Sequence, residues 1–365
     1  MPIPILFTIP NFITAGSGRA MLNIIERLNR KEFAPVVCVI RKGGDLDREV
    51  ERLGIPLIEA SFTVPARPYH SLPVRAWKAA RVFRPYRFAL WHSFHYSDDY
   101  TEPIIARMAG AKCWIYTKKN MGWGSRAWRL RSYLARSIVT QNREMLKEFF
   151  PKQEQKVRLI PRGVDVSKFK ANGTKPNLRS EWRFPEGTTV VGHVGQLVPV
   201  KNHPHLLRAL AKTQSDVGLV MAGDFLDGSY TAEVKALAIE LKVEDRVRFL
   251  GKVRDIPALL SALDIFAFCS HKESCPVALL EAMAHGLPCV VTDIPAMSDI
   301  HIPGQTALVV PKDDVNAFAA ALDELARDQG QRRRLGDTAR KQIEERFTIE
   351  RESSDHQRLY LELAS

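Results

Sequence analysis

Short apolar runs alternate with amphipathic helical stretches along this sequence, and that alternation limits the available folds more than any other feature. Strands that alternate with helices in this way are typical of βα units, whose strands lie parallel in a buried sheet. In the first half, the predicted strands are Ile3–Ile9, Val36–Ile40, Phe88–His92, Cys113–Thr117, Ser137–Thr140 and Val157–Ile160. In the second half, they are Thr189–Gly195, Val217–Ala222, Val247–Leu250, Ile265–Cys269, Cys289–Thr292 and Ala307–Val310. We therefore predict an α/β fold built from parallel sheets.

The length of 365 residues favours two domains, because a single core rarely serves a chain of this size. The polar, turn-rich segment 170–177 has no apolar periodicity and indicates a linker. We predict an N-terminal domain over residues 1–170 and a C-terminal domain over residues 171–348. Two more helices are expected, a charged one over Asp314–Arg346 and a last one over about 349–365.

Composition argues against a membrane-spanning, a secreted or a disulfide-linked protein. A hydrophobic content of 45% and a charged content of 26% are typical of a soluble globular chain, and no apolar run approaches the roughly eighteen residues that span a bilayer. The opening residues lack a basic leader, which favours a first strand over a signal peptide. Five scattered cysteines without a C-x-x-C pair favour reduced thiols in a cytoplasmic protein: Cys38, Cys113, Cys269, Cys275 and Cys289.

Charge is distributed unevenly along the chain. Residues 1–170 hold 30 Lys and Arg against 14 Asp and Glu, a net charge of +16, whereas the remainder has a net charge of −4. Two basic segments, Arg75–Arg87 and Lys118–Arg136, interleave cations with Trp and Tyr. This pattern suits an anionic membrane or glycolipid, and it would also suit nucleic acid, although no nucleic-acid-binding motif accompanies it. A solvated basic face that covers a core is the simpler alternative.

Two glutamates eight positions apart form the most specific motif of the second half. Glu273 precedes a loop broken by Pro276, and Glu281 lies in the apolar helix that follows. Eight positions correspond to about 800° of helical rotation, so on one ideal helix the two side chains would lie about 80° apart, and the proline makes one helix unfavourable. A carboxylate near a helix N-terminus, beside backbone amides that can hold a diphosphate, suits a nucleotide sugar.

The segment Glu273–Pro288 closely resembles the motif of two glutamates separated by seven residues in retaining glycosyltransferases of family 4. The resemblance covers almost the whole chain, and it is specific in the second half and loose in the first. It implies the GT-B fold, in which two Rossmann-like domains face each other across a cleft and the last helix packs back on the first domain. By the same resemblance, Glu281 would bind the ribose hydroxyls and Glu273 the transferred sugar. The backbone around the helix start would meet the diphosphate, through Cys275, Pro276, Val277, Ala278 and Leu279.

The first strand of the second half ends in glycines and is followed by a lysine at a helix entrance. Gly195 would let the backbone approach a ligand, and Lys201 would supply a compact positive charge for phosphate oxygens. The family usually has arginine where this chain has Gln196, so we expect Gln196 to be the weaker contact. Two further segments, Met221–Asp224 and Val247–Gly251, resemble the family's strand ends that face the nucleotide, and they contribute Gly223 and the backbone of Arg248, Phe249 and Leu250.

In the first half, a Gly16-Ser-Gly18 turn is expected before a helix. It lacks the third glycine of a dinucleotide fingerprint, and it resembles the family's double-glycine turn near the donor phosphate. Such a turn alone often serves only close packing. Two histidines, His92 and His95, follow a strand end, where open α/β sheets bind ligands. Either of them would match the family's histidine near the acceptor.

The resemblance implies an enzyme that moves a sugar from a nucleoside diphosphate, with UDP as the expected carrier, to an acceptor hydroxyl with retention. It implies no cofactor and no catalytic metal, and a glycan or lipid-linked acceptor in cell-surface polysaccharide, lipopolysaccharide or glycolipid synthesis. We expect a cytoplasmic protein that binds the inner face of the membrane peripherally and binds no nucleic acid. A nucleotide-sugar epimerase of the same architecture, a Rossmann oxidoreductase and a basic nucleic-acid-binding protein are the alternatives.

Overall fold

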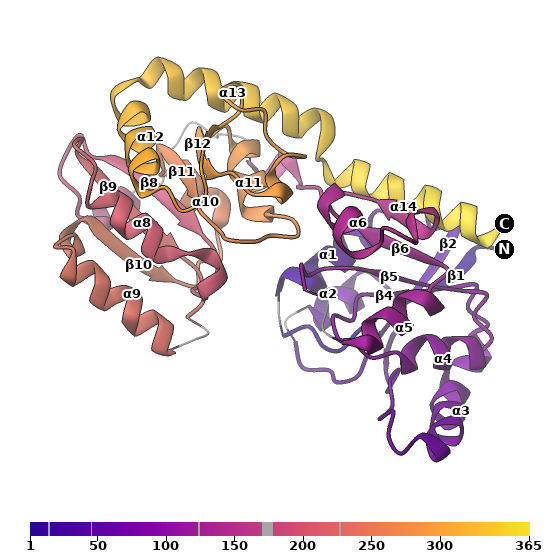
Figure 1. The fold of residues 1–365 in the computed structure, drawn as a ribbon. Coiled ribbons are helices and arrows are strands. Elements are labelled where there is room, and N and C mark those ends of the chain that lie inside the picture. The colour runs from indigo at the N-terminus through magenta and orange to yellow at the C-terminus, as the bar shows by residue number, and fades with distance from the viewer. Residues whose placement is uncertain (14, 45, 123–124, 170–177, 226–227) are drawn as a thin grey trace. The chain divides into compact units, whose positions relative to one another are not determined.

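The computed structural model describes residues 1–13, 15–44, 46–122, 125–169, 178–225 and 228–365 (Figure 1). They form two compact units, one of Met1–Arg162 with Ile349–Ser365 and the other of Gly163–Thr348. The second unit begins at Gly163 because Val164 pairs with Thr348 at that unit's far end. The linker expected at 170–177 lies outside the described residues.

The first unit contains a seven-stranded parallel sheet in the order β3-β2-β1-β4-β5-β6-β7. Its strands are β1 (Ile3–Ile9), β2 (Phe33–Val39), β3 (Leu57–Glu59), β4 (Leu90–Ser93), β5 (Cys113–Thr117), β6 (Ser137–Thr140) and β7 (Val157–Leu159). All but β3, the short edge strand, were expected from apolar runs. Its helices are α1 (Ala15–Glu26), α2 (Asp47–Arg52), α3 (Leu72–Phe83), α4 (Thr101–Met108), α5 (Arg126–Leu134), α6 (Arg143–Phe149) and α14 (Ile349–Ala364).

Alternate residues of β1 enter two different cores, because side chains of a strand alternate between the two faces of its sheet. Leu6 packs with the face covered by α3, α4, α5 and α6, whereas Ile5 and Phe7 pack with the face covered by α1, α2 and α14. Helix α14 is held there by Tyr360, which is fully buried and lies edge-on to Phe7 with ring centroids 6.1 Å apart. The end of the chain is therefore part of the first unit's core.

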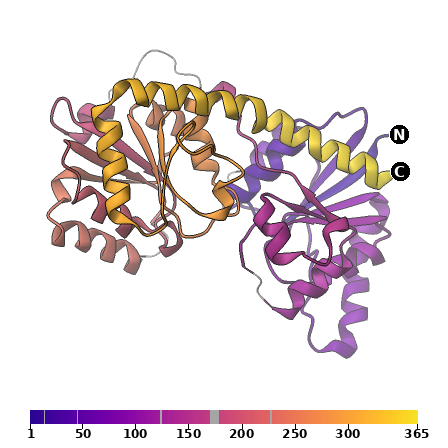
Figure 2. The same cartoon turned by 45° about the horizontal axis from the view of Figure 1, so that its top comes forward.

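The second unit contains a six-stranded parallel sheet in the order β10-β9-β8-β11-β12-β13. Its strands are β8 (Thr189–Val194), β9 (Val217–Ala222), β10 (Val247–Gly251), β11 (Ile265–Phe268), β12 (Cys289–Thr292) and β13 (Leu308–Val310). Its helices are α7 (Leu178–Trp182), α8 (His203–Leu210), α9 (Gly228–Glu240), α10 (Ile256–Ser261), α11 (Val277–His285), α12 (Val315–Arg327) and α13 (Gln329–Arg346). Helices α10, α11 and α13 cover one face of the sheet and α8, α9 and α12 the other (Figure 2).

The prediction of a single charged helix over Asp314–Arg346 is wrong, because the structure contains two helices there, α12 and α13. Asp328 ends α12 and caps α13, since its side chain accepts a hydrogen bond from the amide of Gln331 at 2.8 Å. The cap lets the chain change direction without leaving the helix amides unpaired.

Both sheets have a point at which the strand order reverses, between β1 and β4 in the first unit and between β8 and β11 in the second. Loops leave the carboxyl ends of the two central strands in opposite directions there, and ligands of open α/β folds bind in the crevice between them.

Candidate functional site

In the second unit, the structure brings together Lys201 and Glu273, which are far apart in sequence. Lys201 ends the short 3-10 helix η5 (Pro199–Lys201) after β8, and Glu273 lies in the loop after the neighbouring strand β11. The Nζ of Lys201 lies 2.6 Å from Oε1 of Glu273, and the two side chains are only 20% and 11% exposed. A cation and an anion therefore meet at the reversal point of the sheet, in partial shelter from water.

Gly195, which follows β8, packs beside His193 and Lys201. A Cβ on this residue would lie 3.1 Å from Nε2 of His193 and 3.5 Å from Cδ of Lys201. The Nζ also lies 5.6 Å from the centre of the Phe268 ring, which adds a cation–π contact. Asn202 then adopts the left-handed conformation with φ 56° and turns the chain into α8. This geometry fixes the lysine above the end of the sheet.

Glu281 lies in the second turn of α11 and is half-buried. Pro276 occupies the N-cap position of that helix, with φ −81° and ψ 78°, so the break between Glu273 and Glu281 lies where the motif predicts it. Two of the amides predicted to meet a diphosphate are already bonded within the chain. Val277 donates to the carbonyl of Cys275 at 3.0 Å and Leu279 to that of Pro276 at 2.9 Å.

The predicted donor contacts differ in exposure. The side chain of Leu279 is fully buried in the core, so any contact from this residue would have to come from its backbone. Cys275 and Ala278 are half-buried. Gln196 is exposed in the loop after β8.

Gly223 has a packing role that the sequence did not show. A Cβ on this residue would lie 1.8 Å from the carbonyl oxygen of Gly195, so the backbones after β8 and β9 touch. The amide of Gly223 also donates to the carbonyl of Gly251 at 2.8 Å. Glycine is therefore required at Gly223 for the loops after three adjacent strands to lie together.

The segment Arg248–Leu250 lies on β10, the edge strand of the second sheet. The guanidinium of Arg248 donates to the carbonyl of Trp182 at 2.6 Å and lies 4.6 Å from the ring centre of Phe184. Phe249 and Leu250 pack on opposite faces of the sheet. The Arg248 side chain thus ties α7 to the edge strand. The predicted contact of this segment with a base involves its backbone, so it stays a prediction.

In the first unit, the prediction that the Gly16-Ser-Gly18 turn precedes the helix is wrong. Gly16 and Gly18 lie within the first turn of α1, which begins at Ala15. A Cβ on Gly18 would lie 2.6 Å from Cδ1 of Phe12 and 2.9 Å from Cδ1 of Leu46. Gly18 therefore permits close packing of the helix, whereas Gly16 is exposed.

The structure contradicts His92 as a residue that faces an acceptor. Its side chain is fully buried, Nδ1 lies 2.7 Å from the Tyr360 hydroxyl, and Nε2 lies 2.9 Å from Oγ1 of Thr117. Burial is the main reason that the pKa of His92 lies well below its ordinary value, with a smaller contribution from nearby His356. His92 is therefore a neutral core residue that holds α14, and His95 keeps the predicted role.

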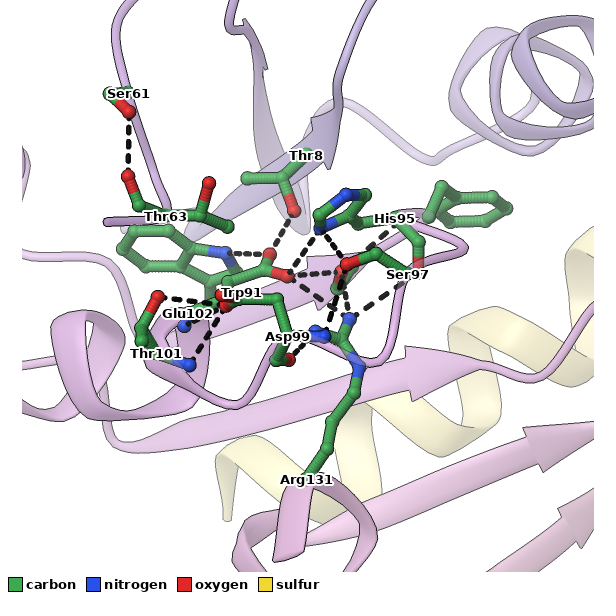
Figure 3. Close-up of polar contacts among 12 residues, drawn as sticks. Thr8, Ser61, Thr63, Trp91, His95, Ser97, Asp99, Thr101, Glu102 and Arg131 are labelled. Atoms are coloured by element: carbon green, nitrogen blue, oxygen red, sulfur yellow. Dashed lines mark hydrogen bonds and ion pairs between the residues drawn. The ribbon is translucent and has the colours of Figure 1, made fainter. Parts of the chain in front are cut away.

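His95 lies in the loop after β4, beside a buried polar cluster that sequence reasoning missed (Figure 3). Glu102, on α4, accepts hydrogen bonds from Thr8 at 2.5 Å, Ser93 at 2.7 Å and the indole of Trp91 at 3.1 Å. Nδ1 of His95 lies 3.9 Å from Oε2 of Glu102. Burial lowers the pKa of His95, and Glu102 opposes that effect in part.

Arg131 completes the cluster from α5. Its Nη2 lies 3.1 Å from Oε2 of Glu102, and both side chains are fully buried. The same guanidinium donates to Oγ of Ser93 at 2.8 Å and to the carbonyls of Asp99 at 2.5 Å and His95 at 3.4 Å. The loop that carries His95 is therefore fixed from below by a buried ion pair.

The described residues contain no group of three or more His, Cys, Asp or Glu side chains that could hold a metal ion. None of the helices within the described ranges is both long and apolar enough to cross a bilayer.

Two Rossmann-like units, each with a polar site where its parallel sheet reverses, define the class of fold called GT-B. A family model described as glycosyl transferases group 1 matches residues 174–342, and one described as Glycosyltransferase Family 4 matches residues 14–168. The chain belongs to this glycosyltransferase family.

Individual relatives and solved structures agree with that assignment. The chain is 28% identical over 233 residues to N-acetyl-alpha-D-glucosaminyl L-malate synthase of Bacillus anthracis, a match that covers 63% of this chain and 58% of that protein. It is 25% identical over 342 residues to UDP-Gal:alpha-D-GlcNAc-diphosphoundecaprenol alpha-1,3-galactosyltransferase of Escherichia coli, covering 87% and 86%. The crystal structure of Anabaena Alr3699/HepE in complex with UDP and glucose has the same fold, with a TM-score of 0.84, 20% identity and 99% of each chain covered.

Proposed function

We propose that this chain is a retaining glycosyltransferase that moves a sugar from a UDP-sugar to an acceptor hydroxyl. The observation that carries the proposal is the pair Lys201–Glu273 at the reversal point of the second sheet, followed by α11 with Glu281. The family membership supports transfer of a sugar. The UDP-Gal in the name of the Escherichia coli relative, and the UDP bound to the Anabaena protein, support uridine as the base.

The geometry suggests how a donor would use the pair. A diphosphate that arrives beside Lys201 would compete with Glu273 for the ammonium group, because the diphosphate group of a nucleotide sugar carries two negative charges and a carboxylate carries one. Lys201 would then stabilise the charge that develops on the leaving diphosphate, and Glu273 would turn to the hydroxyls of the sugar. Glu281 would accept hydrogen bonds from the ribose hydroxyls.

In the proposed reaction, the bond from the anomeric carbon to the diphosphate oxygen breaks. A bond to the acceptor oxygen forms on the same face of the sugar. The acceptor proton passes to the departing phosphate, so the mechanism requires neither a protein base nor a metal ion. His95, fixed above the Glu102–Arg131 pair, would position the acceptor from the first unit.

The acceptor is proposed to be a glycan or a lipid-linked sugar of cell-surface polysaccharide, lipopolysaccharide or glycolipid synthesis. The diphosphoundecaprenol in the name of the Escherichia coli relative supports a lipid-linked acceptor. Because a lipid-linked acceptor lies in a membrane, we also propose a cytoplasmic location and peripheral binding of the basic N-terminal half to the anionic inner face of the membrane. Flotation with anionic rather than neutral vesicles tests this last part.

The substitution Glu281→Ala tests the assignment of the donor site. A hydrogen bond to a charged carboxylate is worth about 1.5–3 kcal/mol, so the loss of even one should lower the affinity for UDP-sugar about 10- to 100-fold. Isothermal titration with a panel of nucleotide sugars gives the dissociation constants. Glu240→Ala, which removes an exposed glutamate from the end of α9, is the matched control.

Unchanged donor affinity in the Glu281→Ala protein would contradict the assigned site. His95→Ala should leave donor affinity unchanged and slow transfer, which distinguishes the proposed acceptor contact from the donor site. A product that is an epimerised nucleotide sugar, formed without any acceptor, would instead favour the epimerase alternative.

A further inference from the structure

A cation-rich cavity lies in the first unit. Its volume is about 670 Å³, and its wall is formed by the carboxyl ends of α4 and α5 with the segments that lead into β5, β6 and β7. Four basic side chains line it: Arg107, Lys112, Arg136 and Lys156.

The cavity lies at the amino ends of the strands of the first sheet, whereas His95 lies at their carboxyl ends. Lys112, Arg136 and Lys156 each come directly before a strand, so they mark the amino ends of β5, β6 and β7. His95 follows the carboxyl end of β4, and the strands are parallel. A ligand in this cavity would therefore be separate from the proposed acceptor site.

The charges that face the cavity have no acidic partner in its wall. None of the described residues that line it is an aspartate or a glutamate, and the sequence contains no acidic residue between Glu102 and Glu144. Burial lowers the pKa of Lys156, and the charge of Arg136 lowers it further. An anion between these side chains would relieve that repulsion.

Two helices end at the cavity, and the negative ends of their dipoles would oppose an anion. The carbonyls there are already bonded to cations. That of Met108 accepts a hydrogen bond from Nε of Arg84 at 3.2 Å, and that of Tyr133 accepts one from Nζ of Lys156 at 2.8 Å. The positive charges of Arg84 and Lys156 therefore lie against these helix ends and offset their negative dipole ends.

Trp114 also lines the cavity and is 5% exposed, so an aromatic side chain lies between the cations and the core. On the outer side, Tyr133 is 70% and Leu134 40% exposed, which gives the cavity an apolar rim.

We propose that this cavity binds a phosphate-bearing anion. Arginine and lysine together are the side chains that proteins use for phosphate, since the guanidinium forms paired hydrogen bonds and the ammonium acts as a point charge. The phosphate belongs either to a soluble ligand or to a lipid headgroup whose chain lies against Tyr133 and Leu134.

Binding to the full-length chain tests the proposal in two arms. Isothermal titration with inorganic phosphate, at constant ionic strength set with chloride, measures a soluble ligand. Co-sedimentation with phosphatidylcholine vesicles, with or without phosphatidic acid, measures a lipid headgroup. The test variant is Arg136→Gln with Lys156→Gln. The control is Lys31→Gln with Arg48→Gln, which removes the same charge from exposed positions of the same unit outside the cavity.

The test variant should bind phosphate or phosphatidic acid vesicles about 10-fold more weakly, whereas the control should remain within about 2-fold of the original protein. Binding of inorganic phosphate without vesicle binding identifies a soluble ligand, and the reverse identifies a lipid. The proposal is overturned if neither probe binds, or if test variant and control lose affinity equally.

Discussion

Glu102 and Arg131 are charged side chains without exposure to solvent, and the neighbouring groups account for how the fold tolerates them. Removing two ions from water costs more than their attraction returns unless further hydrogen bonds satisfy both groups. Here the carboxylate accepts from Thr8, Trp91 and Ser93 besides the guanidinium. The pair therefore holds β1, β4, α4 and α5 in one arrangement beneath His95.

Replacing Arg131 with methionine should destabilise the first unit strongly. The substitution keeps much of the side-chain volume and leaves Glu102 as a buried charge without its cation, which costs about 3–5 kcal/mol. Urea unfolding followed by circular dichroism should show a lower free energy of unfolding. Arg129→Met removes an exposed cation two residues earlier on the same helix, and it should change that free energy by less than about 0.5 kcal/mol. Equal stability of the two variants would show that the pair contributes nothing.

Some of the site was predictable from the sequence and some was not, for a physical reason. Lys201 and Glu273 each follow a predicted strand, and the ends of neighbouring parallel strands meet, so their approach could be anticipated. The choice between His92 and His95 depended on α14, which returns from the end of the chain to bond His92 through Tyr360. No local pattern connects residues so distant in sequence.

At the scale of elements, α13 packs on α11 through two glycines. A Cβ on Gly336, in α13, would lie 2.0 Å from the carbonyl oxygen of Gly286, the left-handed residue that ends α11 with φ 85°. Because that oxygen belongs to the backbone, a side chain could be accommodated only if one helix moved. The placement of α11, which carries Glu281, thus depends on a residue outside the motif.

Gly336→Ala should push α13 away from α11 and lower the stability of the second unit, by about 1–3 kcal/mol for overpacking of a tight contact. Because α11 would shift, donor affinity should fall with it. Gly330→Ala, in the first turn of the same helix, meets only the side chain of Asp328, with Oδ1 at 3.2 Å, and should change the stability by less than about 1 kcal/mol. Thermal melting and donor titration of both proteins measure the difference, and a Gly336→Ala protein as stable as the Gly330→Ala protein would refute the packing argument.

The strands were more predictable than the helices and turns. Buried parallel strands are continuous apolar runs, so β1, β5, β6, β9 and β12 lie where the sequence placed them. The edge strand β3 was missed because Leu57–Glu59 is short and ends in a charged residue. The division between α12 and α13 was missed because Asp328 lies within a long helical pattern, where a capping role depends on its backbone conformation.

At the scale of the whole molecule, both units contain buried histidines that the fold keeps neutral. Burial lowers the pKa of His193 to about 4 and that of His203 to about 2 in the second unit, and that of His356 to about 4 in the first. His92 is lowered in the same direction by the same cause. Each is at most 2% exposed. Both units should therefore respond to acid in the same range of pH.

The stability of the protein should fall as the pH drops below about 6.5. A histidine with a lowered pKa in the folded state stays neutral there, while the unfolded chain takes up a proton at about 6.5, so acid favours unfolding. The stabilisation is complete above about 6.5 and is lost progressively towards the folded-state value of about 4 for His193 and His356. Each such histidine contributes about 1.4 kcal/mol per pH unit within that interval.

Urea midpoints at pH 8, 7, 6 and 5 measure this dependence. The midpoint should be nearly constant from pH 8 to pH 7 and should fall from pH 6 to pH 5. His356→Gln removes one of the buried groups and should make the decline shallower, whereas His70→Gln removes an exposed histidine and should leave the profile unchanged. A midpoint at pH 5 equal to that at pH 8 would mean that these side chains take up protons in the folded protein as readily as in the unfolded chain.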